Sequence, residues 1–155
     1  MRIEPYLGDR ATLLPLFALA DDSPTQVAAY LPLGEILVAR NGAQVVGHAQ
    51  VLASEAPGEF ELKSLAVLEE RQGAGIGRDL VAAVVASCRE RGGRRLIVST
   101  AAASVGTLRF YQRQGFRMYR IVQDAFGPSN GYPDGLLIDG IPLRDQVFLE
   151  LALSP

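Results

Sequence analysis

The sequence has very little cysteine and histidine. Its 155 residues include one cysteine, Cys88, and one histidine, His48. A single cysteine excludes a disulfide within the chain, and the two residues together supply too few soft ligands for a zinc cluster. The chain must therefore fold on its apolar core, and we expect no metal site.

The sequence also lacks an excess of charge, a long apolar run and a signal-peptide pattern. The formal net charge of -2 gives no general attraction to phosphate backbones or anionic lipid. The longest apolar runs, such as Leu80 to Val85, are far shorter than the roughly 20 residues that cross a bilayer. The amino terminus has no signal-peptide pattern. We expect a cytoplasmic protein with neither nucleic acid nor membrane as partner.

What the sequence does contain is enough apolar residues for one core. Apolar residues make up 48% of the chain, which is too many for intrinsic disorder. The length is close to the roughly 150 residues of one domain. We therefore expect residues 1–155 to form a single domain.

Hydrophobic periodicity predicts alternating strands and helices. Apolar and β-branched runs predict strands at residues 3–6, 35–40, 44–52, 60–67, 95–100, 116–122 and 146–151. Helical spacing predicts two helices within residues 9–31, the second starting at Ser23-Pro24, a long helix from Gly75 to about Arg91, and a helix capped by Ser104. Asn41-Gly42 predicts a two-residue hairpin turn.

Residues 123–145 form a long segment rich in Gly, Pro, Asp and Asn. A segment of this length without regular structure is uncommon inside a compact domain unless it is functional or forms a local hairpin. Asp139-Gly140 favours a small hairpin, and Pro142 restricts that hairpin to an edge.

The clearest chemical signal is a glycine-rich turn between a predicted strand and the long helix. Gly73, Gly75 and Gly77 let the backbone approach a ligand closely, and the helix N-terminus adds roughly half a positive charge. Glycines also serve simply to make tight turns. A dinucleotide fingerprint needs GxGxxG and an acidic residue after the next strand. Here the spacing is GxGxG and the next strand ends in Ser99-Thr100, so a nicotinamide cofactor fits poorly.

The run from Gln72 to Gly77 resembles the acyl-CoA signature of the GNAT N-acetyltransferase superfamily, QxxGxG. The resemblance spans about residues 35–122. It implies a mixed α/β fold with a twisted, mainly antiparallel sheet, helices on both faces and a splayed central strand. It also implies that acetyl-CoA binds to the turn, to the main chain of the strand before it, to the start of the following helix and, through pantetheine, to Ser104 at the start of the second motif helix. The corresponding residues are Leu65, Ala66, Val67, Gln72, Gly73, Ala74, Gly75, Ile76, Gly77, Arg78 and Ser104.

The same resemblance implies two catalytic residues. Tyr111 matches the usual general acid, and a phenol with a pKa near 10 can donate a proton to a leaving thiolate. Glu61 matches a strand position that carries a glutamate base in some members, and alternation places it on the same face as Leu65. His48 or a water chain is an alternative base. Cys88 lies on an apolar helix stripe and reads as core.

These features predict an acetyl-CoA-dependent N-acetyltransferase that moves an acetyl group directly to the primary amine of a small molecule. Two alternatives remain open at this point. One is an enzyme that modifies protein N-termini or lysines, and the other is a non-catalytic acyl-CoA-binding module. Formation of a homodimer is also left open.

Overall fold

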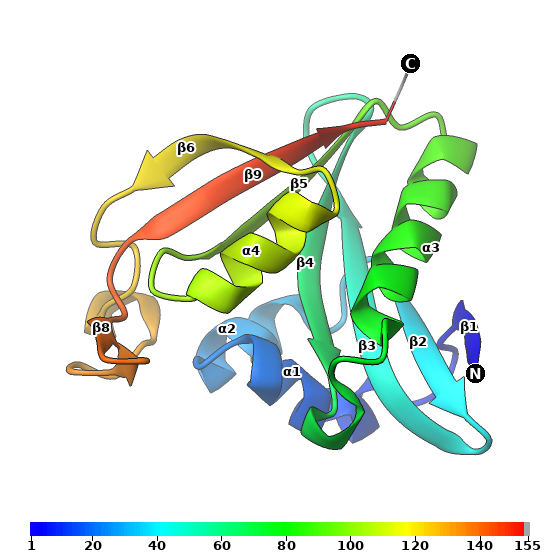
Figure 1. Cartoon of the computed structure of the whole chain (residues 1–155), viewed down its shortest axis with the longest axis horizontal. Helices are drawn as coiled ribbons and strands as arrows, with labels where there is room; N and C mark the ends of the chain where they lie inside the picture. Colours follow the sequence, from blue (N-terminus) through cyan, green and yellow to red (C-terminus); the bar gives the residue numbers. More distant parts are fainter. Residues whose placement is uncertain (154–155) are drawn as a thin grey trace.

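The computed structural model describes residues 1–153 and is built on a seven-stranded sheet in the order β1-β2-β3-β4-β5-β9-β6 (Figure 1). All neighbouring strands are antiparallel except β4 and β5. The strands are β1 (Arg2–Pro5), β2 (Glu35–Asn41), β3 (Gln44–Ala53), β4 (Glu59–Val67), β5 (Arg95–Ala101), β6 (Arg117–Val122) and β9 (Gln146–Ala152). The predicted mixed α/β fold with a mainly antiparallel sheet is confirmed.

Four α-helices cover the two faces of the sheet. One face carries α3 (Ile76–Glu90) and α4 (Val105–Arg113), and the other carries α1 (Leu14–Ala20) and α2 (Pro24–Tyr30) (Figure 1). Single 3-10 turns occupy Arg10–Leu13, Glu69–Arg71 and Pro128–Asn130. No helix within residues 1–153 is long and apolar enough to span a bilayer.

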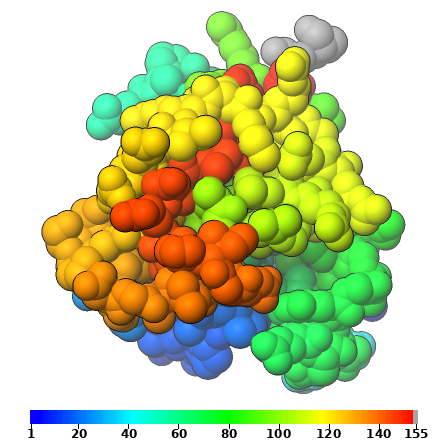
Figure 2. Space-filling model, turned by 60° about the vertical axis from the view of Figure 1, so that its left-hand side comes forward, coloured from blue at the N-terminus to red at the C-terminus, as the bar shows by residue number. Residues whose placement is uncertain are grey.

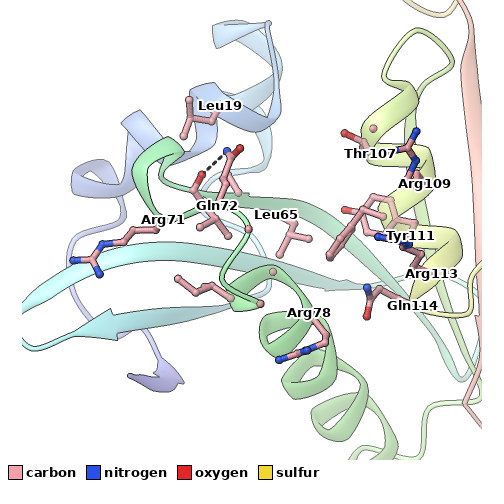
Figure 3. Close-up of a pocket in the computed structure, with 18 residues that line it drawn as sticks. Leu19, Leu65, Arg71, Gln72, Arg78, Thr107, Arg109, Tyr111, Arg113 and Gln114 are labelled. Atoms are coloured by element: carbon pink, nitrogen blue, oxygen red, sulfur yellow. Dashed lines mark hydrogen bonds between the residues drawn. The ribbon is translucent and has the colours of Figure 1, made fainter.

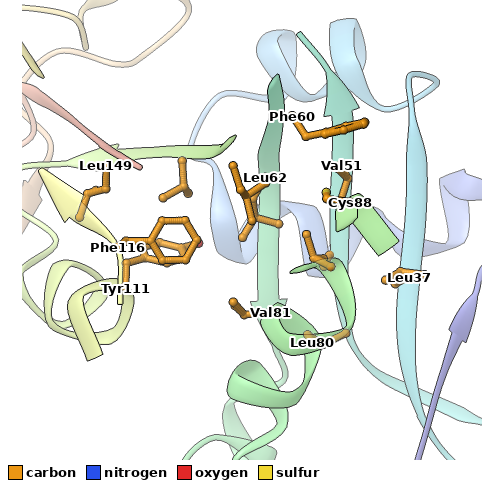
Figure 4. Close-up of a cluster of buried hydrophobic side chains, with 14 of the residues drawn as sticks. Leu37, Val51, Phe60, Leu62, Leu80, Val81, Cys88, Tyr111, Phe116 and Leu149 are labelled. Carbon is orange, nitrogen blue, oxygen red and sulfur yellow. The ribbon is translucent and has the colours of Figure 1, made fainter. Parts of the chain in front are cut away.

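The sheet divides the core into two clusters, one on each face. Strand β2 is buried on both faces and contributes side chains to both clusters. Leu37 and Ala39 pack in the cluster under α3 and α4, here called the front cluster, part of which Figure 4 shows. Ile36 and Val38 point the other way, into the back cluster under α1 and α2. A strand buried on both sides reads as a continuous apolar run, which is how β2 reads in the sequence.

Glycines bound α3 at both ends. Gly75 stands at the N-cap with φ 87°, and Gly92 follows the last turn with φ 75°. The apolar stripe of α3 is buried in the front cluster and includes Cys88, which is fully buried. Burial raises the pKa of the Cys88 thiol to about 11, so Cys88 is a core residue and not a nucleophile.

The two hairpin predictions differ in outcome. Asp139 and Gly140 both have positive φ and join β7 (Leu137–Ile138) to β8 (Ile141–Pro142), as predicted. In the β2–β3 hairpin the predicted turn is wrong by one residue. Asn41 pairs with Gln44, so the two-residue loop is 42–43, with Gly42 at φ 63°.

A β-bulge in β4 changes which side chains share a face. Val51 of β3 pairs with Leu62 and the neighbouring Gln50 pairs with Ser64, which leaves Lys63 unpaired in this ladder. Leu62 and Leu65 therefore both pack in the front cluster, although they are three residues apart. The expectation that Glu61 and Leu65 share a face is wrong, because the extra residue interrupts the alternation.

The splayed central strand is confirmed. Pairing between β4 and β5 runs only from Glu59 and Arg95 to Leu62 and Val98. Beyond Leu62 the two strands continue without pairing to each other, to Val67 and Ala101. The main chain of the second half of β4 is therefore open along this edge.

Candidate active site

A cavity of about 740 Å³ lies where β4, the start of α3 and the inner side of α4 meet (Figure 3). This volume is typical of a site for a small molecule or cofactor. Its lining is formed by Leu19, Leu65, Ala66, Val67, Arg71, Gln72, Gly73, Gly75, Ile76, Gly77, Arg78, Gly106, Thr107, Arg109, Phe110, Tyr111, Arg113 and Gln114. All the residues expected to bind acetyl-CoA are among them, except Ala74 and Ser104.

The three glycines of the turn have different structural roles. Gly73 has φ 83°, and a β-carbon there would meet no protein atom within 4 Å, so the position faces open space. At Gly75, with φ 87°, a β-carbon would lie 2.8 Å from the Arg78 guanidinium. At Gly77 it would lie 3.3 Å from the Phe110 ring, so this glycine lets α4 pack closely on α3. Only Gly73 and Gly75 require the left-handed backbone that favours glycine.

The hydrogen-bond ladder decides which main-chain groups of β4 face the open edge. The Leu68 amide donates to Val46 of β3 at 2.9 Å, and hydrogen-bonded pairs alternate along an antiparallel ladder. Ala66 is therefore bonded to β3, whereas Leu65 and Val67 direct their main-chain groups to the open edge. This revises the expected main-chain role of Ala66. The Gln72 side chain donates to the Val67 carbonyl at 3.0 Å and so ties the turn to the strand.

Tyr111 projects from α4 into the inner end of the cavity. It is 5% exposed and packs edge-on against Phe110 and Phe116. Burial raises the pKa of Tyr111 above its ordinary value, so the phenol holds its proton at every physiological pH. Ser104 occupies the N-cap position of α4, but its side chain makes no capping bond within residues 1–153. The predicted N-cap position is therefore confirmed without a side-chain capping bond, and Thr107 rather than Ser104 lines the cavity.

The two candidate bases lie outside the cavity lining. Glu61 is half-buried and pairs in register with Ile97, one residue before β4 and β5 part. It lies on the back face of the sheet, opposite Leu62. His48 is fully buried, stacks on Phe17 and shares a 2.8 Å hydrogen bond with Ser64. Burial lowers the pKa of His48 to about 3, which leaves it neutral and inaccessible.

The cavity is cationic, and two of its arginines were not predicted from the sequence. Four arginines line it, two near the turn and two on α4, and its lining contains no aspartate or glutamate. Arg109 and Arg113 are spaced by one helical turn, a pattern that could have been noticed from the sequence. Within residues 1–153 no three His, Cys, Asp or Glu side chains gather as a metal site requires.

An open strand edge, a glycine turn at a helix N-terminus and a protonated phenol in one cationic cavity define an acyltransferase site for an extended anionic donor. The chain belongs to the GNAT family of acetyltransferases. The sequence model of the protein family described as "Acetyltransferase (GNAT) family" matches residues 10–116. The sequence is 34% identical to the uncharacterized N-acetyltransferase YvbK of Bacillus subtilis (strain 168), over 99% of this chain and 97% of that protein.

Solved structures agree with this assignment. A Bacillus subtilis acetyltransferase in complex with CoA is 32% identical, with a TM-score of 0.89 and 99% of each chain covered. An IAA acetyltransferase from Bacillus cereus ATCC 14579 is 34% identical, with a TM-score of 0.87 over 97% of this chain and 98% of that one. A GNAT acetyltransferase from Elizabethkingia anophelis with acetyl-CoA bound is 28% identical, with a TM-score of 0.88 and 97% of each chain covered.

Proposed function

We propose that this acetyltransferase moves the acetyl group of acetyl-CoA directly to the primary amine of a small molecule. The observation that carries the proposal is that one cavity joins the glycine turn, the open edge of β4 and Tyr111. CoA or acetyl-CoA is bound in two of the similar structures, which supports the same donor here. The turn amides of residues 73–78 would hold the diphosphate, and Leu65 and Val67 would hydrogen-bond the pantetheine arm.

In direct transfer, the neutral amine attacks the thioester carbonyl, a C–N bond forms and the C–S bond breaks. The leaving thiolate belongs to a thiol with a pKa of about 8.5, so a proton donor beside the sulfur favours its departure. Tyr111 is suited to this step because burial keeps its phenol protonated. Holding donor and amine together in one site provides the main gain in rate.

The attacking amine must lose a proton, and Glu61 is the proposed base. The donor cavity is lined mainly by β4, α3 and α4, with Leu19 from α1, and we propose that the amine approaches from the back face through the gap between β4 and β5. Glu61 lies on that back face, next to the gap, and acts directly or through a water chain. Glu61→Gln should lower kcat by about ten- to a hundredfold and leave the affinity for acetyl-CoA unchanged. The exposed Glu55→Gln is the matched control, and equal rates for both variants would contradict a role for Glu61.

A small acceptor is supported by the way residues 123–145 fold onto the N-terminal helices. The Tyr132 hydroxyl donates to Asp21 at 2.9 Å, and the Gln26 side chain donates to the Asn130 carbonyl at 2.9 Å. Figure 2 shows the β7–β8 hairpin beside a hollow bordered by α4 and α1. A docked segment at this place narrows the approach for a folded protein or a bulky peptide.

The acceptor class can be tested by following thiol release with a panel of primary amines and a matched panel of short peptides bearing free N-termini or lysines. We expect turnover with small amines and little or none with peptides. Turnover with peptides alone would favour the protein-modifying alternative. Acetyl-CoA binding without thiol release from any acceptor would favour the non-catalytic module. Two solved ribosomal-protein-alanine N-acetyltransferases resemble this chain at 22% and 18% sequence identity. At these identities the resemblance shows a shared fold and does not favour a protein acceptor.

A further inference from the structure

The α4 wall of the cavity carries two arginines whose presence is not explained by phosphate binding at the glycine turn. Arg109 and Arg113 both line the cavity, although neither belongs to the turn. At about 100° per residue, they lie on one side of Phe110 and Tyr111 lies on the other. Both arginines are exposed and Tyr111 is buried, so the pair stands at the outer rim and the phenol at the inner end.

The charges of this pair are not compensated by the protein. Within residues 1–153 neither guanidinium forms an ion pair, whereas Arg78 in the same cavity pairs with Asp79 at 3.3 Å. Like charges four residues apart on a helix repel each other. With no carboxylate in the lining, such a pair is stabilised when an anion binds between the two guanidinium groups.

The position of the pair also places it on the path of a long ligand. Arg109 and Arg113 line a second, shallow groove of about 510 Å³ on their other side, together with Val105, Leu108, Gln112 and Met118. The pair is therefore shared by the cavity and this groove and stands between them. A ligand that leaves the cavity over α4 passes both guanidinium groups.

CoA carries a diphosphate and, separately, a phosphate on the 3′-oxygen of its ribose. The turn at the start of α3 accounts for the diphosphate. We infer that Arg109 and Arg113 form a second anion subsite that binds the 3′-phosphate of acetyl-CoA. This inference rests on the proposed function. A dianionic phosphate matches two guanidinium groups in charge, and each can donate two parallel hydrogen bonds to it.

The test compares the binding of CoA and 3′-dephospho-CoA by titration calorimetry. Wild-type protein should bind CoA about ten- to a hundredfold more tightly than 3′-dephospho-CoA, as expected for hydrogen bonds to a charged group. In the double variant Arg109→Gln/Arg113→Gln this ratio should fall to about one, because only the affinity for CoA decreases. The matched control Arg94→Gln/Arg117→Gln removes two exposed arginines away from the cavity and should keep the wild-type ratio.

Three outcomes would overturn the inference, and they can be told apart. Equal affinity of wild-type protein for both ligands would show that no 3′-phosphate subsite exists, with the proposed donor intact. An equal loss of affinity for both ligands in the double variant would place the arginines on the diphosphate. If wild-type protein binds neither ligand, the proposed function fails together with the inference. Unchanged melting temperatures without ligand would exclude misfolding of the variants.

Discussion

At the scale of single residues, burial shifts the pKa values of the two candidate proton-transfer groups, Tyr111 and His48, in opposite directions. Burial disfavours the charged form of any side chain, so it raises the pKa of the Tyr111 phenol and lowers the pKa of the His48 imidazole. A phenol that keeps its proton is a better candidate acid. An imidazole that stays neutral behind Phe17 serves only packing and its hydrogen bond to Ser64.

Replacing Tyr111 tests the acid role. Tyr111→Phe should lower kcat by about ten- to a thousandfold and leave the dissociation constant of acetyl-CoA within about twofold, because the phenol acts when the thiolate leaves. Thiol release and calorimetry measure the two quantities. Tyr6→Phe is the control, since within residues 1–153 the Tyr6 hydroxyl bonds only to Asp9 and Thr12 and lies outside the cavity lining. If Tyr111→Phe keeps the wild-type kcat, Tyr111 is not the acid and serves only as an aromatic side chain of the core.

The buried His48 predicts a dependence of stability on pH. The pKa of His48 is about 3 in the folded state and about 6.5 in the unfolded chain, so between these values only the unfolded state binds the proton. The free energy of unfolding should therefore fall as the pH drops below 6.5, by at most about 1.4 kcal/mol per pH unit from this group. Urea unfolding at pH 7.5 and 5.2 measures the fall.

His48→Gln isolates this contribution, because glutamine does not titrate. The variant should be less stable than wild type at pH 7.5, yet lose less stability between pH 7.5 and 5.2. An equal loss in both proteins would mean that His48 does not carry the dependence. Asp and Glu titrate mainly below this window, which keeps their contribution small.

At the scale of elements, the segment 123–145 is not a free loop. Tyr132 donates to one oxygen of Asp21 and Tyr30 donates to the other, so one carboxylate anchors the segment to the helices α1 and α2. Gly131 has φ 85°, and a β-carbon there would lie 2.6 Å from the Ser23 hydroxyl. The anchor joins residues 111 positions apart in sequence.

Removing the Tyr132 hydroxyl should loosen this segment. In Tyr132→Phe we expect faster amide hydrogen exchange across residues 126–133 and a severalfold higher KM for the amine, with KM for acetyl-CoA unchanged. Tyr30→Phe is the matched control, because it removes a hydrogen bond from the same Asp21 but keeps the segment attached. If exchange rises while the amine KM stays constant, the segment does not shape the acceptor site.

At the scale of the whole molecule, the proposed function assigns the two substrates to opposite faces of the sheet. The front face holds the donor cavity between α3 and α4, and the back face holds Glu61 beside the gap between β4 and β5. The bulge at Lys63 makes this division possible, because it turns Leu65 to the front while Glu61 faces the back. In the proposed reaction, donor and acceptor meet where the two strands part.

Binding of the donor should stabilise the fold. Acetyl-CoA at a hundred times its dissociation constant adds about 2.7 kcal/mol if only the native state binds it, and calorimetric melting measures the gain. Gly73→Ala should lose most of this gain, because the new methyl group enters the space where the turn meets phosphate. An unchanged melting temperature of wild-type protein with saturating acetyl-CoA would contradict the donor assignment.

Gly92→Ala is a matched control for Gly73→Ala. Both glycines have positive φ, 75° and 83°, and at both a β-carbon would meet no protein atom within 4 Å. Each substitution should therefore cost a similar free energy of unfolding without ligand, about 1–2 kcal/mol. Only Gly73→Ala should lose the stabilisation by acetyl-CoA, because Gly92 lies at the far end of α3.

The sequence by itself determined the elements and the donor turn of this protein. Period-2 and period-3.6 patterns, and the glycines at 73 and 75, act over a few neighbouring residues, so their consequences can be derived without a fold. The strands, the helices, the β7–β8 hairpin and the splayed strand were predicted on that basis or from the GNAT resemblance. That Tyr111 and the turn serve one site was implied by the GNAT resemblance, and the structure places both in one cavity.

The tertiary structure decided what depends on contacts between distant segments. The bulge at Lys63 depends on how β3 pairs with β4, and it reversed the expected face of Glu61 relative to Leu65. The neutral state of His48 depends on burial under Phe17, which no local pattern reveals. Arg109 joins the turn arginines only because α4 packs against Gly77. Register, burial and long-range packing are properties of the assembled sheet, so the acceptor side and the charge of the cavity could be described only after folding.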